Sequence, residues 1–156
     1  IPPKKGKTHV LRIIRELIEF KPESKKTDIG TALQFLISVI KKKSIAFILS
    51  DFISPDFEKI LRVTAKKHDV TGIRVYDKLE ETIPNLGLVP MFDQETEKIR
   101  LVDTSSLELR NKYKKQNSLN FKKINELFSK NGAGTLVCRT DESYVKKLLS
   151  YFKKRG

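Results

Sequence analysis

Apolar residues recur at helical spacing in the first part of the chain, and Pro22 ends the first of these patterns soon after Phe20. The first predicted helix carries Val10, Leu11, Ile14, Leu17 and Ile18 at this spacing. The second predicted helix carries Ile29, Leu33, Leu36, Ile37 and Ile40, with Ala32, Phe35 and Val39 beside them. Because its apolar surface is so wide, we expect the second helix to be largely buried.

A strand, a helix and a second strand follow. The continuous apolar run from Ile45 to Leu49 is typical of a strand covered on both faces of a parallel sheet, so we expect it to be central. Ser54 as N-cap and Pro55 at the first helical position predict a third helix that ends near His68. Thr71 to Tyr76 is the next strand, and a right-handed crossover makes it parallel to the first.

The middle of the chain predicts a loop and then a β-hairpin. No period is visible between Lys78 and Gly87. Leu88 to Phe92 and Lys98 to Val102 flank the turn Asp93-Gln94-Glu95-Thr96, and Pro90 restricts its strand to an edge. We expect this hairpin to be an elaboration on the sheet.

The last third predicts a helix, a strand and a helix. Ser105 and Glu108 form a capping box for a basic helix that is interrupted near Ser118 and ends before Asn131. Thr135 to Arg139 is the third strand of the sheet. Thr140 or Asp141 caps a final helix with Tyr144, Val145, Leu148, Leu149 and Phe152 on one face. The whole pattern predicts an α/β fold in which residues 1–156 form one domain.

The net charge of +13 and the pI near 9.8 permit binding to nucleic acid or to an anionic membrane surface. The excess is mostly lysine, whereas base recognition relies on arginine and stacked aromatic rings, so a solvated lysine surface is favoured and no specific nucleic-acid partner is expected. Neither Ala32 to Ile40 nor Ile45 to Leu49 approaches the roughly 20 residues of a membrane span.

The single cysteine, Cys138, cannot form an internal disulfide and is expected to be a small buried hydrophobic residue. We therefore expect a reducing compartment, the cytoplasm. The opening Ile-Pro-Pro-Lys-Lys-Gly is neither a signal peptide nor a helix, which suggests a fragment whose upstream part is missing.

Oxygen-bearing side chains are expected at the carboxyl edge of the sheet, where ligands of open α/β sheets collect. Asp51, Asp77 and Asp141 follow the three strands, while Thr27 and Asp28 stand at the mouth of the second helix. Such hard ligands suit Mg²⁺. His68 and Asp69 end a helix on the opposite edge, and no phosphate loop or nucleophile pair argues for an enzyme.

Several segments resemble known families. Thr27 to Leu33 and Ile48 to Phe52 are similar to the second and third segments of the metal-ion-dependent adhesion site of von Willebrand factor A domains. Six further segments, in order, resemble the bacterial family called domain of unknown function 58: Pro2 to Gly6, Ser50 to Phe52, His68 to Val70, Val75 to Asp77, Asp93 to Thr96 and Val102 to Thr104.

The resemblance implies a three-layer α/β/α, von Willebrand factor A-like sheet of Rossmann-like type, truncated at its N-terminal half. It also implies metal-site roles for Thr27 and Asp51. The first segment of such a site, Asp-x-Ser-x-Ser, is not in this chain, so we expect weak or no specific Mg²⁺ binding. From the residues alone, Thr27 and Asp28 also fit a helix N-cap, and Asp51 fits an acceptor for loop amides.

The resemblance further implies a non-catalytic adaptor or assembly factor that works with a MoxR-type AAA+ ATPase and is anchored to the inner membrane only by upstream segments. Alternatives are a metal-dependent phosphoesterase using Asp51 and Asp77, and nucleic-acid binding through the lysine surface. In the usual strand order of such folds, Ser44 to Ser50 lies in mid-sheet. Without its neighbour it would be an open edge, which predicts a homodimer through that edge.

Overall fold

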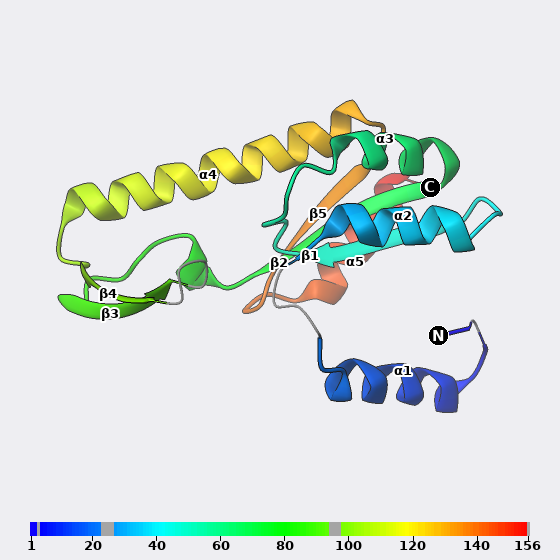
Figure 1. Cartoon of the computed structure of the whole chain (residues 1–156), viewed down its shortest axis with the longest axis horizontal. Helices are drawn as coiled ribbons and strands as arrows, with labels where there is room; N and C mark the ends of the chain where they lie inside the picture. The colour runs from blue at the N-terminus through cyan, green and yellow to red at the C-terminus, as the bar shows by residue number, and fades with distance from the viewer. Residues whose placement is uncertain (3, 23–26, 94–97, 156) are drawn as a thin grey trace.

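A computed structural model of the chain describes residues 1–2, 4–22, 27–93 and 98–155 (Figure 1). Helices and strands follow one another in the order α1 (Lys7–Glu19), α2 (Ile29–Val39), β1 (Ile45–Ser50), α3 (Glu58–Lys67), β2 (Asp69–Tyr76), the 3-10 helix η1 (Lys78–Glu80), β3 (Leu88–Asp93), β4 (Lys98–Asp103), α4 (Leu107–Lys130), β5 (Gly134–Arg139) and α5 (Tyr144–Arg155). The α/β fold class predicted from the sequence is confirmed.

Three parallel strands form the main sheet in the order β1-β2-β5. Ile45 of β1 is paired with Asp69 of β2, and Thr71 of β2 is paired with Gly134 of β5. The central strand is therefore β2, and the prediction that Ile45 to Leu49 is central was wrong for the described part of the chain. A continuous apolar run shows that both faces of a strand are suited to burial, but it does not show whether a neighbouring strand is present.

Helices lie on both faces of this sheet. On one face, α2, α3 and the C-terminal part of α4 enclose the core, whose buried members are Ile29, Leu33, Phe52, Phe57, Leu61, Val70, Phe128 and Ala133. On the other face, α5 reaches the sheet through a 3.0 Å hydrogen bond between the hydroxyls of Tyr151 and Thr71 and through contact of Phe152 with Phe47. Gly72 of β2 leaves room for the rings of Phe52 and Phe128, because a Cβ there would lie within 3 Å of both.

The first two helices are less buried than their apolar patterns suggest. No residue of α1 is buried, and Figure 1 shows this helix apart from the sheet. In α2 only Ile29 and Leu33 are buried, while Phe35 and Val39 are exposed, so the prediction that this helix is largely buried was wrong. Both helices have apolar surface beyond what one sheet face covers.

The predicted hairpin is present but does not belong to the main sheet. Strands β3 and β4 form a separate antiparallel pair, which lies beside the N-terminal part of α4 (Figure 1). Of its predicted turn, residues 94–97 lie outside the described part of the chain. The expectation that the hairpin elaborates the main sheet was therefore wrong: residues 77–87 lead the chain from β2 to the hairpin, and α4 leads it back to β5.

Several predicted caps act elsewhere. The Ser54 hydroxyl accepts the backbone N–H of Ile29 at 3.1 Å, so it holds α2 rather than capping α3. Ser106, not Ser105, caps α4 by accepting the N–H of Leu109, and α4 continues without interruption past Ser118. Thr140 and Asp141 hydrogen-bond to Asp77 and Arg139, and the last helix begins only at Tyr144. Side chains at loop ends satisfy whichever backbone group lies nearest, which sequence order alone does not reveal.

Two simpler expectations concern burial and hydropathy. Cys138 is buried, as its apolar neighbours predict. Among the described residues, no helix combines the length and the apolar character that a membrane crossing requires.

Candidate functional site

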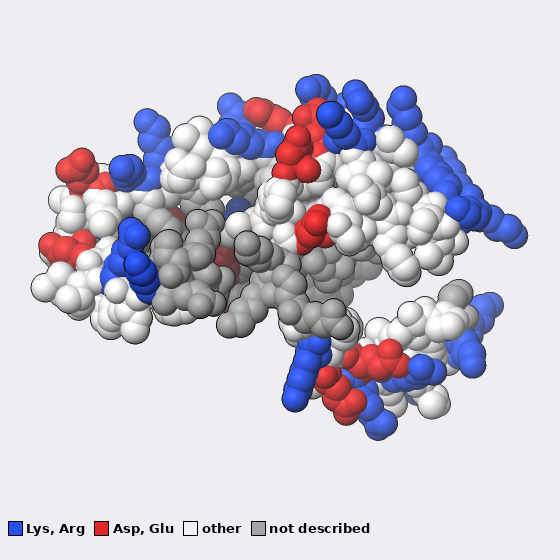
Figure 2. Space-filling model, in the orientation of Figure 1, with Lys and Arg blue, Asp and Glu red and all other residues white. Residues whose placement is uncertain are grey.

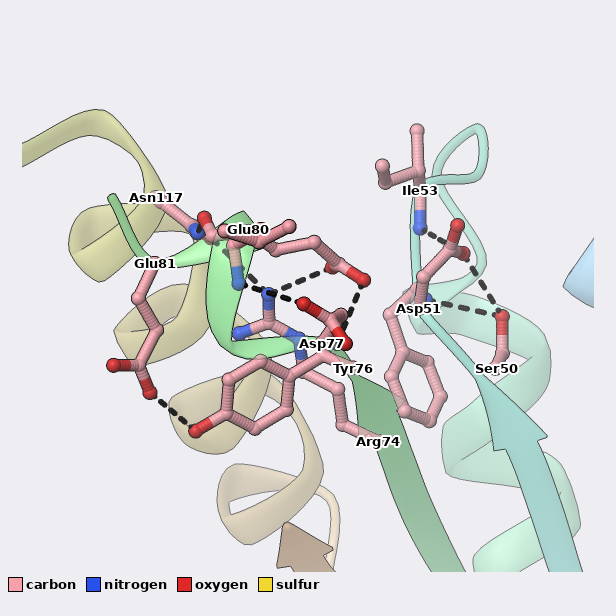
Figure 3. Close-up of polar contacts among 11 residues, drawn as sticks. Ser50, Asp51, Ile53, Arg74, Tyr76, Asp77, Glu80, Glu81 and Asn117 are labelled. Atoms are coloured by element: carbon pink, nitrogen blue, oxygen red, sulfur yellow. Dashed lines mark hydrogen bonds and ion pairs between the residues drawn. The ribbon is translucent and has the colours of Figure 1, made fainter. Parts of the chain in front are cut away.

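A tight turn follows β1 at the carboxyl edge of the sheet (Figure 3). Asp51 Oδ1 accepts the backbone N–H of Ile53 at 3.1 Å and lies 3.3 Å from the hydroxyl of Ser50. Phe52 then adopts a left-handed backbone with φ of 63°, which is strained for a residue with a side chain. The turn sends the Phe52 ring into the core, 5.2 Å from the ring of Phe128, and leaves the Asp51 carboxylate at the surface.

Thr27 and Asp28 lie at the same end of the sheet as this turn, because the next residue, Ile29, donates its backbone N–H to the Ser54 hydroxyl at 3.1 Å. Asp28 caps α2: its Oδ1 accepts the N–H of Thr31 at 2.9 Å, and its Oδ2 accepts the Thr31 hydroxyl at 2.8 Å. The backbone hydrogen bond from Thr31, followed by the one from its hydroxyl, lowers the pKa of Asp28 below its ordinary value. Asp28 is therefore the N-cap of α2, which is the structural role that the sequence suggested for it.

The other two aspartates at this edge hold loops in place. Asp77 Oδ1 accepts the N–H of Leu79 at 2.8 Å, and its Oδ2 accepts the hydroxyl of Thr140 at 3.0 Å, which joins the ends of β2 and β5. Asp141 pairs with the guanidinium of Arg139, and this hydrogen bond lowers the pKa of Asp141. Each carboxylate thus has a structural partner.

These residues do not together complete a metal site. Within residues 1–2, 4–22, 27–93 and 98–155, no three His, Cys, Asp or Glu side chains are grouped closely enough to hold a metal ion. Both carboxylate oxygens of Asp28 accept hydrogen bonds in the cap of α2, and one oxygen of Asp51 accepts a hydrogen bond in its turn. Mg²⁺ needs near-octahedral oxygen coordination, which this donor set does not supply.

The sequence reasoning missed the side chains that lie beside this turn on β2 and α4. Arg74 of β2 lies between the rings of Tyr76 and Phe121, with its guanidinium carbon 4.9 Å and 5.2 Å from their centroids. Its Nη2 donates to Asn117 Oδ1 of α4 at 3.1 Å (Figure 3). An arginine inside the otherwise apolar run of β2 was the available signal, since such a residue must find partners at the strand end.

Tyr76 completes this cluster. Its hydroxyl donates to Glu81 Oε1 at 2.5 Å, and this hydrogen bond, with burial, raises the pKa of Tyr76 to about 12. The phenol therefore stays protonated at neutral pH, which suits a residue that positions Arg74 rather than one that transfers a proton.

His68 lies at the start of β2, on the edge opposite Asp51, where the sequence predicts it. It is buried, and neither of its ring nitrogens has a hydrogen-bond partner among the described residues. Because Asp69 pairs with Ile45 at the start of β1, His68 lies far from the aspartates at the carboxyl ends of the strands.

A mainly apolar groove lies between α2 and β1 at the open side of the sheet. Its walls are Ala32, Leu33 and Leu36 of α2, the C-cap residue Ile40, and the whole of β1, Ile45–Ser50. Strand β1 forms the floor of this groove and also the edge of the sheet within the described residues. The groove therefore combines apolar side chains with strand backbone groups.

Comparison with known proteins places the chain in a family. Residues 1–122 match the family described as "Protein of unknown function DUF58". The chain belongs to this family. Proteins similar to the chain include the Uncharacterized protein MAV169 of Mycobacterium avium, which is 25% identical over 158 residues covering 99% of this chain and 93% of the relative. No solved structure matches the chain.

Two longer relatives are the Uncharacterized proteins Mb1516 of Mycobacterium bovis and Rv1480 of Mycobacterium tuberculosis. Each is 23% identical over 158 residues, which cover 99% of this chain and 50% of the relative. The chain thus spans about half the length of these two mycobacterial proteins.

Proposed function

We propose that this chain is a non-catalytic protein-interaction module, an adaptor or assembly factor that works with a MoxR-type AAA+ ATPase. The observation that carries the proposal is the open edge of β1. In the described residues β1 pairs only with β2, and its exposed side chains Ile45, Phe47 and Leu49 are apolar. A long apolar edge of this kind invites an added strand from another chain.

The hydrogen-bond pattern indicates which backbone groups are free to bind. The carbonyl of Ser44 accepts the N–H of Asp69 at 2.9 Å, so the backbone groups of Ser44 point toward β2. In a parallel ladder successive residues alternate, which directs the N–H and C=O groups of Ile45, Phe47 and Leu49 to the open edge. A partner segment would pair with these three residues and fill the groove beside α2.

The positive net charge of the chain favours a protein partner with an acidic surface. Figure 2 shows Lys and Arg side chains spread along the side of α3 and α4 and at one end of the molecule, with Asp and Glu between them. The net charge of +13 would speed the approach of an acidic surface, while the apolar edge would supply the lasting contact.

A pair of substitutions at Leu49 tests the proposal. Leu49→Pro removes an outward N–H without breaking the ladder to β2, because proline is tolerated where an edge N–H faces outward. Leu49→Ala removes the side chain but keeps the N–H. We expect Leu49→Pro to abolish binding to a purified MoxR-type ATPase of the same organism, measured by surface plasmon resonance, and Leu49→Ala only to weaken it. Equal binding by the wild-type protein and Leu49→Pro would contradict the proposal.

A further inference from the structure

A second pocket, whose walls include several polar side chains, lies on the other side of the turn after β1, between that turn and α4. Asp51 and Ile53 of the turn line it, as do Gln116, Asn117 and Asn120 of α4 and Arg74 of β2. It is separate from the groove under α2, whose walls are α2 and β1. Its lining is rich in amide side chains, which both donate and accept hydrogen bonds.

Arg74 has far fewer acceptors in this pocket than its guanidinium can use. The side chain is only 14% exposed, so most of its water is lost. A guanidinium carries five N–H donors, but among the described residues the hydrogen bond of Nη2 to Asn117 is the one that it makes. In the described part of the chain Nε is buried without a hydrogen-bond partner, and Glu80 Oε2 lies 3.9 Å from Nη2, close enough for an ion pair but beyond hydrogen-bonding distance.

The neighbouring side chains that could act as acceptors are engaged in other hydrogen bonds. Glu80 Oε1 is held by the N–H of Asp77 at 3.0 Å, as part of the capping box of η1. Asn117 is held from both ends, because its Nδ2 also donates to the carbonyl of Glu80. The rings of Tyr76 and Phe121 fix the plane of the guanidinium by cation–π contact. Arg74 is therefore pre-organised for an acceptor that comes from outside.

We propose that this pocket binds one carboxylate of a protein partner, an acidic side chain or a chain end, with Arg74 as its principal donor. Planar bidentate pairing with a carboxylate is the interaction that a fixed guanidinium makes best. Amide groups of Gln116 and Asn120 stand beside it and suit the peptide backbone on either side of that carboxylate. This inference rests on the proposed function in one respect: it takes the ligand of the pocket to be part of a protein.

The charges around the pocket define the ligand further. Lys123 lines the pocket with Arg74, and these two cations balance Asp51 and Glu80. Because the charges of the pocket nearly cancel, its preference for a ligand depends on the directions of its hydrogen-bond donors. A ligand with a single carboxylate therefore suits the pocket better than a segment with several acidic residues. A free small carboxylate shares this chemistry, so the experiment must separate the two sources.

The test is a nitrogen-15 NMR titration of the whole chain with an acetylated, amidated pentapeptide that has one glutamate between alanines. Two control ligands are titrated in the same way: the same peptide with glutamine in place of the glutamate, and free N-acetylglutamate amide. We expect saturable shifts of the side-chain amides of Asn117, Asn120 and Gln116, with the glutamine peptide about tenfold weaker, as loss of a charge-assisted hydrogen bond implies. If N-acetylglutamate amide binds as tightly as the peptide, the claim that the carboxylate belongs to a protein partner is contradicted.

Three variants complete the test. Arg74→Gln should weaken the glutamate peptide about tenfold, whereas Lys122→Gln, an equal change of charge on exposed α4 outside the pocket, should leave its affinity nearly unchanged. Asn120→Asp adds a negative charge at an exposed site and should weaken binding even if Arg74→Gln fails to fold. Equal affinity for the two peptides, or equal loss in Arg74→Gln and Lys122→Gln, would overturn the inference. Leu49→Pro should leave this titration unchanged, so the pocket and the β1 edge can fail separately.

Discussion

The rings of Phe52 and Phe128 meet edge to face, with centroids 5.2 Å apart and an interplanar angle of 75°. This contact joins the turn after β1 to the C-terminal part of α4, across the central strand. Gly72 lies beneath it, and an added Cβ would come within 2.6 Å of Phe128 and 2.9 Å of Phe52. The position of Asp51 thus depends on a glycine in a different strand.

We predict that Gly72→Ala lowers the free energy of unfolding by about 1–3 kcal/mol, the usual cost of over-packing a core. The rings can relieve the clash only by moving, which would disturb the Asp51 turn. Urea unfolding of the two proteins followed by circular dichroism measures the difference. An unchanged midpoint and slope would mean that the Phe52 and Phe128 rings do not pack on Gly72 as described.

Asp28 should make the stability of the chain depend on pH. Its hydrogen bonds from Thr31 lower its pKa in the folded state, so the unfolded chain binds the proton more readily. The contribution of Asp28 is therefore complete above its ordinary value of 3.8 and is lost as pH falls through the lower folded value. We expect Asp28→Asn to destabilise the protein at neutral pH and to approach the wild-type stability in strong acid, as urea unfolding at both pH values would show. A constant difference would contradict this account.

Weak or absent Mg²⁺ binding also remains to be tested. Because Asp51 already accepts a backbone N–H and Asp28 uses both oxygens on its cap, we expect no saturable rise in melting temperature with millimolar Mg²⁺. A saturable rise in the wild-type protein that disappears in Asp51→Asn would show that the carboxyl edge does bind the ion.

The same open edge predicts self-association when no partner is present. At increasing concentration the chain should dimerise through Ile45–Ser50, since a second copy offers the same unpaired strand. Sedimentation equilibrium should show a dimer for the wild-type protein and a monomer for Leu49→Pro. A wild-type protein that stays monomeric at high concentration would contradict the expectation.

The regular elements could be predicted because their signals are local. Apolar period and turn chemistry located β1, β2, β5 and the hairpin. The order of strands and helices also predicted that the start of α2 lies beside the turn that carries Asp51, where the Ser54 hydroxyl accepts the N–H of Ile29. Helix caps were less predictable, because the Ser54 hydroxyl binds the N–H of Ile29, which is 25 positions away in the sequence.

What escaped sequence reasoning depends on contacts between distant segments. The pairing of Arg74 with Asn117 spans 43 positions and depends on where α4 crosses the end of β2. The left-handed backbone of Phe52 is likewise unreadable locally, because it is enforced by the fit of its ring against Phe128. Whether β1 is an edge or a central strand depends on a neighbour, about which the residues of β1 carry no information.

The most direct measurement of the central claim is amide hydrogen exchange along β1, alone and with the MoxR-type ATPase. In dilute free protein, the amides of Ala46, Ile48 and Ser50 should exchange slowly because they face β2, while those of Ile45, Phe47 and Leu49 should exchange rapidly. We predict that the ATPase slows exchange at Ile45, Phe47 and Leu49. Binding of the ATPase with no added protection at these three amides would show that the β1 edge is not the docking surface.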